Sequence, residues 1–78
     1  MDYMIIEETK GKIRKTLVEC RLEKGMTQTE VGKSVGKSKT AVASWEQGYS
    51  LPDAVTLYRL AKIYGKTLAY MYGEEHDD

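Results

Sequence analysis

The chain is poor in the residues that cross-link small proteins or build reactive sites. Its 78 residues include one cysteine, one histidine and one proline, and no phenylalanine. A single cysteine, Cys20, excludes an internal disulfide, and the sequence offers no cluster of cysteine and histidine metal ligands. His76 lies in an acidic tail and is better interpreted as a solvated side chain than as a metal ligand. We therefore expect no metal or cofactor, and stability from dense helix packing or from a dimer.

Long apolar runs are also absent. The longest one near the start, residues 4–6, is far shorter than the roughly 20 residues that cross a bilayer, and no signal peptide is recognisable. One free thiol fits a reducing cytoplasm, so we expect a cytoplasmic protein without a membrane partner. An enzyme is not expected, because the sequence shows no nucleophile–base pair, paired carboxylates or phosphate-cradling loop.

The formal net charge is zero, but the charges are unevenly distributed. Residues 1–8 and 71–78 hold seven acids and no lysine or arginine. Residues 9–70 hold all 12 basic residues and five acids, which leaves a net charge of +7. A basic middle is compatible with a solvated surface of mixed sign and also with phosphate binding.

Capping residues and glycines delimit five helices, predicted at residues 9–24, 27–36, 38–47, 53–65 and 67–73. Apolar residues recur within them at helical spacing. We expect the inward-facing residues to be Ile13, Leu17, Cys20, Val31, Val35, Val42, Trp45, Ala54, Leu57, Leu60, Ala61, Tyr64, Leu68 and Met71. On such a face Cys20 is more plausibly a small core residue than a reactive thiol. The predicted fold is an all-α, compact five-helix bundle.

This bundle is predicted to be one domain, residues 9–73. Residues 1–8 are assigned to an N-terminal arm and residues 74–78 to an acidic disordered tail. Residues 3–6 are short, apolar and β-prone, so a strand, an extended arm and a partner contact all remain open.

Residues 27–48, TQTEVGKSVGKSKTAVASWEQG, carry the strongest functional signal. They predict two short helices joined by a tight turn, the arrangement that places a helix in the DNA major groove. Together with Arg21, Pro52 and the helix–glycine alternation that follows, the stretch resembles the Cro/CI-type (Xre-like) helix-turn-helix family of phage and bacterial repressors. The resemblance covers residues 13–73 and implies a lambda-repressor-like DNA-binding domain.

The resemblance also implies roles for individual residues. DNA contacts are expected from Gln28, Lys37, Ser38, Lys39, Thr40, Ala43, Ser44, Tyr49 and Ser50. Gln28 matches a phosphate-binding position at a helix N-terminus, where free N–H groups favour an anion. Thr40 and Ser44 are expected at base edges, Lys39 at guanine or a phosphate, and Ala43 at a thymine methyl. Contacts to the DNA backbone are expected from Lys37, Ser38, Tyr49 and Ser50. For each expected contact residue, the alternative is a side chain that is simply exposed to solvent.

Arg21 and Glu46 match a pair that forms a largely buried salt bridge, so both are expected to be structural rather than DNA-contacting. Two features depart from the family pattern. Gly32 stands where a small, methyl-bearing residue is usual, which bears on how closely the second and third helices pack. We also expect no strong bidentate base contact from Gln, Asn or Arg in the third helix, so that specificity rests partly on DNA shape.

A DNA-binding domain this small contacts few base pairs, and members of the family form dimers across a two-fold axis. Tyr70, Met71 and Tyr72 are expected at a homodimer interface, with the N-terminal arm as a further candidate contact. The alternative is that these tyrosines complete the core of the single chain. The functional hypothesis is a sequence-specific regulator of double-stranded DNA, a repressor that binds an inverted-repeat operator as a dimer and is nucleoid-associated when bound. The alternative is a protein-interaction module, such as an antitoxin or anti-repressor partner.

Overall fold

The computed structural model describes residues 3–74, and their side chains from residue 6 onward. Five helices make up this part of the chain: α1 (Tyr3–Lys24), α2 (Gln28–Val35), α3 (Lys39–Gln47), α4 (Ala54–Tyr64) and α5 (Leu68–Met71). Residues 3–74 contain no strand. The predicted all-α five-helix bundle is therefore confirmed. His76 and most of the predicted acidic tail, residues 75–78, lie outside the described residues.

Local capping explains where four of the helices begin. The side chains of Thr27, Ser38, Asp53 and Thr67 each accept a hydrogen bond from the backbone N–H three residues later, at 3.1, 3.1, 2.8 and 3.0 Å. At Thr27 the capping box is complete, because the Glu30 carboxylate accepts from the Thr27 N–H at 2.9 Å. These bonds satisfy N–H groups that have no partner inside the helix. The four caps agree with the sequence prediction.

The first helix begins at Tyr3, so the predicted start at Thr9 is wrong. A strand or an extended arm over residues 3–8 is likewise not observed. The β-branched residues here cost only about 0.7 kcal/mol each in a helix, and extending an existing helix by further residues is easier than starting one. An ion pair between Glu7 and Lys10, one turn apart at 3.7 Å, adds a small stabilisation.

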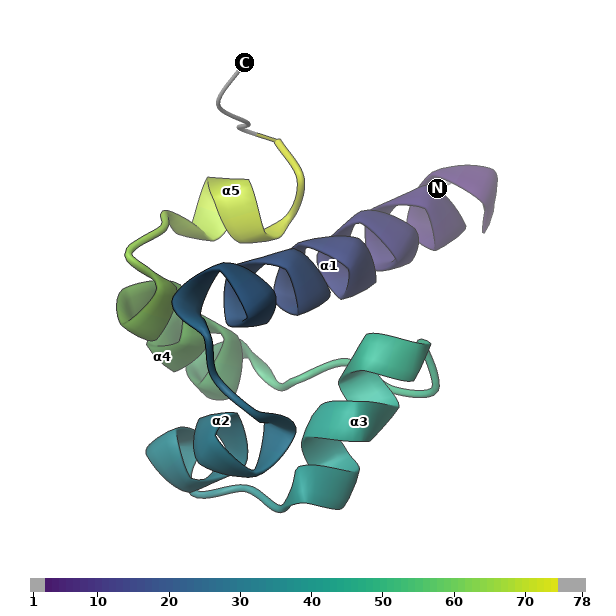
Figure 1. Ribbon diagram of the computed structural model, residues 1–78. Helices are drawn as coiled ribbons and strands as arrows, with labels where there is room; N and C mark the ends of the chain where they lie inside the picture. The colour runs from purple at the N-terminus through teal and green to yellow at the C-terminus, as the bar shows by residue number, and fades with distance from the viewer. Residues whose placement is uncertain (1–2, 75–78) are drawn as a thin grey trace.

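The core lies where α1 crosses the molecule between α5 on one side and the α2–α3 pair on the other (Figure 1). Leu17, Leu60, Met71, Val31 and Val42 are fully buried. Most of the other predicted core residues are also buried: Ile13, Cys20, Val35, Trp45, Leu57, Ala61 and Tyr64. Burial raises the pKa of the Cys20 thiol, in keeping with a core residue rather than a reactive one.

Two predicted core positions are wrong. Ala54 is exposed, and Leu68 is 40% exposed on the outer side of the single turn of α5. The inward position in the first turn of α4 belongs to Thr56, which is 4% exposed. Its own N–H is held by the Asp53 cap, and this fixes the rotation of the helix start. Within residues 3–74, no helix combines the length and apolarity needed to span a membrane.

Candidate nucleic-acid interface

The α2–turn–α3 unit is held together at Gly32. A Cβ built on Gly32 would lie 2.5 Å from the carbonyl oxygen of Lys37, closer than real Cβ atoms approach. The Lys37 N–H donates to the Gly32 carbonyl at 2.8 Å. A glycine is thus required by the close approach of the turn to α2. The departure from the family pattern at this position makes the contact tighter rather than looser.

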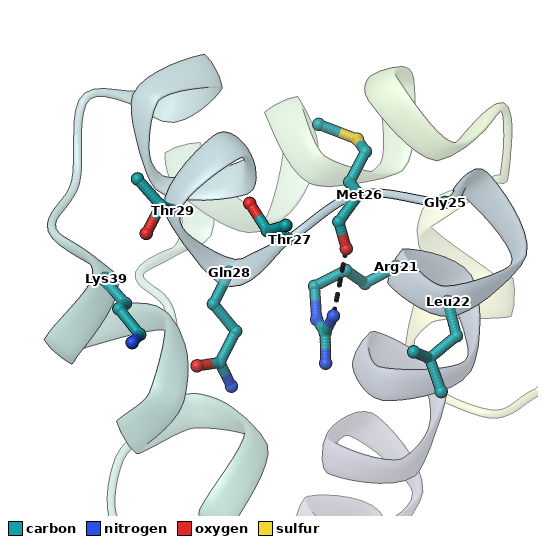
Figure 2. Close-up of a pocket in the computed structure, with 8 residues that line it drawn as sticks. All are labelled: Arg21, Leu22, Gly25, Met26, Thr27, Gln28, Thr29 and Lys39. Carbon is teal, nitrogen blue, oxygen red and sulfur yellow. Dashed lines mark hydrogen bonds between the residues drawn. The ribbon is translucent and has the colours of Figure 1, made fainter.

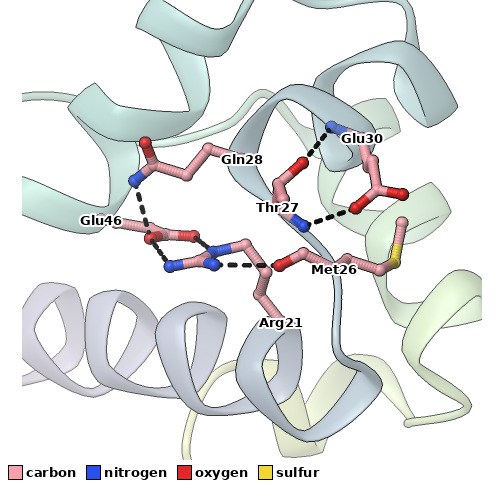
Figure 3. A network of polar contacts seen from close by, with 6 residues as sticks. All are labelled: Arg21, Met26, Thr27, Gln28, Glu30 and Glu46. Carbon is pink, nitrogen blue, oxygen red and sulfur yellow. Dashed lines mark hydrogen bonds and ion pairs between the residues drawn. The ribbon is translucent and has the colours of Figure 1, made fainter.

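Arg21 of α1 and Glu46 of α3 form the ion pair that the resemblance implied (Figure 3). Arg21 Nε donates to Glu46 Oε2 at 2.7 Å and Nη2 donates to Oε1 at 3.0 Å. The two side chains are only 15% and 6% exposed. The hydrogen bond to Glu46 raises the pKa of Arg21. Arg21 also donates to the Met26 carbonyl at 3.0 Å, so the pair fixes α1, α3 and the α1–α2 loop to one another.

Gln28 joins the same network, which the sequence did not predict. Its Nε2 donates to Glu46 Oε1 at 3.0 Å, across from α2 to α3. Figure 2 shows the side chain directed into a hollow between α2, α3 and the end of α1, with Lys39 on the facing side. The amide is therefore held in one orientation, with its second N–H still unused by Glu46.

The N-terminus of α2 opens into this hollow. The capping box uses the N–H groups of Thr27 and Glu30, and the Val31 N–H donates to the Thr27 carbonyl. Among the described residues this leaves the N–H groups of Gln28 and Thr29 to an external acceptor. Two free N–H groups at the positive end of a helix dipole, next to Lys39, form a site suited to an anion such as phosphate.

The exposed side of α3 forms a second hollow, lined by Lys39, Thr40, Ala43, Ser44, Gln47 and Tyr49. Lys39 and Thr40 are exposed, whereas Ala43 and Ser44 are half-buried. Four of the predicted base-contacting residues thus share one face. Gln47 belongs to the same hollow, and its amide has the donor and acceptor groups for a bidentate base contact. The interpretation that the third helix lacks a Gln, Asn or Arg residue suited to such a contact is therefore wrong, because Gln47 is its last residue. The amino-acid sequence alone is enough to show this.

Other predicted contact residues flank this face. Ser44 Oγ and Ser50 Oγ are hydrogen bonded at 2.7 Å, and Tyr49 is 81% exposed. The Ser38 hydroxyl accepts the capping bond and keeps its own proton for a partner. Lys37 Nζ lies 3.6 Å from Asp53 Oδ2. With side chains 40% and 61% exposed, this pair is weak enough for a phosphate to compete for the lysine.

A model of the helix-turn-helix family matches residues 17–71, from the middle of α1 to the end of α5. The chain belongs to this family, in its Cro/CI (Xre) type. The match includes the whole α2–turn–α3 unit and both members of the Arg21–Glu46 pair.

Several curated proteins resemble the chain. The transcriptional repressor RstR of a cryptic CTXphi phage in Vibrio cholerae is 30% identical over 72% of the chain and 50% of the repressor. The regulator ImmR of Bacillus subtilis (strain 168) is 30% identical over 78% of the chain and 48% of the regulator. Multiprotein-bridging factor 1c of Arabidopsis thaliana is 26% identical over 88% and 47%. The chain spans about half the length of these relatives. No solved structure gave a significant match.

The expected dimer residues of this Cro/CI-type chain are not equally accessible. Met71 is 0% exposed in the core of the single chain, so its assignment to a dimer interface is wrong. Tyr70 is half-buried and its ring lies 4.6 Å from Lys66 Nζ. Tyr72 is 38% exposed. Of the three, only Tyr72 and the open edge of Tyr70 are available to a partner.

Proposed function

We propose that the chain binds double-stranded DNA sequence-specifically and represses transcription from an inverted-repeat operator. The exposed face of α3 carries this proposal. Its side chains are small, basic or able to hydrogen bond, which suits a helix that enters the major groove, and the hollow at the N-terminus of α2 lies beside it. Thr40, Ser44 and Gln47 supply groups for base edges. Gln28, Lys39 and the free α2 N–H groups supply groups for a phosphate.

We further propose that the chain acts as a homodimer, because one α3 spans too few base pairs for a specific operator. Tyr72, Tyr70 and the start of α1 are the proposed contact surface. Sedimentation at tens of micromolar should give the mass of a dimer, and Tyr72→Ala should shift the mass toward the monomer. The matched control is Tyr58→Ala on α4, a tyrosine of similar exposure (50%). A monomer mass for the unmodified chain would contradict the proposal.

Selection of binding sites from a randomised duplex pool tests the DNA-binding function. Salt near about 150 mM suppresses the binding that any basic surface shows at low salt. We expect an enriched inverted repeat with half-sites roughly 10 base pairs apart. Lys39→Ala should weaken binding to it by about ten-fold, the loss of one good base or phosphate contact. Lys15→Ala on α1 removes the same charge far from α3 and should change little.

An interaction module is the second candidate function, and one observation favours it. Val55 and Tyr58 lie one turn apart on α4 and are 63% and 50% exposed, forming an apolar surface separate from the α3 face. If Lys39→Ala and Ser44→Ala leave DNA binding unchanged but abolish a protein contact, the regulator proposal fails. If Val55→Ser and Tyr58→Ser abolish a protein contact while DNA selection stays intact, the chain has both surfaces.

A further inference from the structure

A third hollow lies at the C-terminal end of α3, next to the two hollows described above. It is lined by Lys10, Gly48, Tyr49, Ser50 and Leu51. Tyr49 also lines the hollow on the exposed face of α3, which in turn shares Lys39 with the hollow at the α2 N-terminus. The three hollows therefore form one continuous surface along α3. The sequence prediction placed Lys10 in the first turn of a helix that began at Thr9, and it assigned Lys10 no role.

One cation of α1, Lys10, lines this third hollow, and a second, Arg14, lies against its lining residue Gly48. Lys10 and Arg14 lie four residues apart and thus on one face of α1, which passes over the C-terminal end of α3 (Figure 1). A Cβ placed on Gly48 would lie 3.2 Å from Arg14 Cδ and 3.8 Å from its Nε, so the Arg14 side chain lies against Gly48. The early start of α1 gives these residues a continuous helix on both sides.

The charges of these two residues are largely uncompensated. Arg14 makes no hydrogen bond or ion pair with the residues that the structure describes. The partner of Lys10 is Glu7 at 3.7 Å, with side chains 50% and 46% exposed, which is a weak surface pair. The neighbouring hydroxyls of Ser50 and Tyr49 are exposed and can donate. Two available cations beside two hydroxyl donors are a combination that binds phosphate.

The position of the site points to a phosphate of the DNA backbone. A helix of nine residues is about 13 Å long, close to the roughly 12 Å width of the major groove. The hollow at the α2 N-terminus includes Lys39, the first residue of α3, whereas Arg14 lies against Gly48, which follows the last residue of α3. A duplex that receives α3 therefore presents one strand to each of these two places. We propose that Lys10 and Arg14, with the Ser50 hydroxyl, bind a backbone phosphate on the strand opposite to the one bound at α2. This inference rests on the proposed DNA-binding function.

The salt dependence of DNA binding tests the proposal. Arg14→Ala and Lys10→Ala should each weaken binding by about ten-fold, equally on the selected operator and on an unrelated duplex. Each should also reduce the slope of log K against log salt concentration by about 0.9, the value for one phosphate contact. Arg14→Lys should keep the slope, and Lys15→Ala, on another face of α1, should match the unmodified chain. Unfolding followed by Trp45 fluorescence verifies that each variant is folded.

A neutral backbone locates the phosphate. A methylphosphonate placed at each operator position in turn removes one phosphate charge at a time. At one position it should weaken DNA binding by the unmodified chain but not weaken binding by Arg14→Ala any further. We say that such a position couples to the substitution. The position that couples to Arg14→Ala should lie on the opposite strand from the position that couples to Gln28→Ala. If no position couples to Arg14, or if the slopes of Arg14→Ala and Lys15→Ala agree, this site is refuted while DNA binding stands. If the unmodified chain binds no duplex, both proposals fail together.

Discussion

The ion pair between Arg21 and Glu46 lies mostly out of solvent, and each charge depends on the other. Removing Arg21 would leave the Glu46 carboxylate buried with only the Gln28 amide as a partner. We expect Arg21→Ala to lower the free energy of unfolding by about 3 kcal/mol, the lower end for loss of one partner of a buried pair. Urea unfolding followed by Trp45 fluorescence measures it.

The matched comparison is the exposed pair of Lys15 and Glu19, 4.0 Å apart with side chains 75% and 54% exposed. Glu19→Ala should cost about 0.5 kcal/mol or less, because solvent already screens this pair. Equal losses for Arg21→Ala and Glu19→Ala would mean that the buried pair adds no more than a surface one.

The Ser44–Ser50 hydrogen bond has a consequence for base selection. Each hydroxyl carries one proton. If Ser50 gives its proton to a phosphate, Ser44 must give its own to Ser50, at the observed 2.7 Å, and only lone pairs of Ser44 face the base. We expect Ser44 then to select a base that presents an amino group in the major groove, adenine or cytosine.

Ser50→Ala should release the Ser44 proton and admit guanine and thymine at that one operator position. Site selection with the variant measures the base frequencies there. Ser34→Ala, which removes a hydroxyl bonded within α2, is the control and should leave them unchanged. Identical frequencies for Ser50→Ala and the unmodified chain would show that the two hydroxyls act independently.

Among the helical elements, α2 depends most directly on a glycine. Glycine in a helix normally costs about 1 kcal/mol relative to alanine. At Gly32 we expect the reverse, because the added Cβ would displace the Lys37 carbonyl. Gly32→Ala should destabilise the chain by about 1–3 kcal/mol, the usual cost of overpacking. Thermal unfolding should show a lower midpoint, by roughly 4–8 °C per kcal/mol.

Gly11 of α1 is the matched control. A Cβ there meets no atom within 4 Å. Gly11→Ala should therefore stabilise the chain by about 0.5–1 kcal/mol. If Gly32→Ala and Gly11→Ala changed the thermal unfolding midpoint in the same direction, the close approach at Gly32 would be contradicted.

The elements differ in how well the sequence predicts them. The starts of α2, α3, α4 and α5 are marked by a side chain that bonds an N–H three residues away, a purely local signal. The start of α1 has no such signal, and Thr9 mimics one. The Gln28–Glu46 bond joins residues 18 positions apart, and Arg14 lies against Gly48 of another element; both depend on how helices pack. The sequence therefore predicted which residues lie on the exposed side of α3 better than it predicted the contacts between helices that hold those residues in place.

For the whole molecule, stability should change with pH at both extremes. Hydrogen bonds from the N–H groups of Thr27 and Thr56 lower the pKa of Glu30 and Asp53, respectively. A lowered pKa means that the unfolded chain binds more protons, so stability is lost as the pH falls below about 4. Burial raises the pKa of Tyr64 and of Cys20. The folded chain then keeps protons that the unfolded chain releases, so stability also falls as the pH rises past about 8.5.

Urea midpoints measured from acid to alkaline pH should thus form a plateau with a decline on each side. A variant with both Glu30→Gln and Asp53→Asn keeps groups able to accept the capping bonds but cannot titrate there. It should show a shallower acid decline and an unchanged alkaline one. An acid decline as steep as that of the unmodified chain would assign the effect to other carboxylates.

Because Cys20 is buried, the rate at which its thiol is labelled reports how often the whole bundle opens. At 3% exposure it is closed to reagents in the folded state, and it contacts the core from near the C-terminal end of α1. A thiol-directed dye therefore reacts only in the moments when the helices separate. When reclosing outpaces the dye, the labelling rate divided by that of the unfolded chain gives the fraction of open molecules under native conditions, without denaturant. Slower labelling in the presence of an operator duplex would show that bound DNA stabilises the folded chain and lowers the fraction of open molecules.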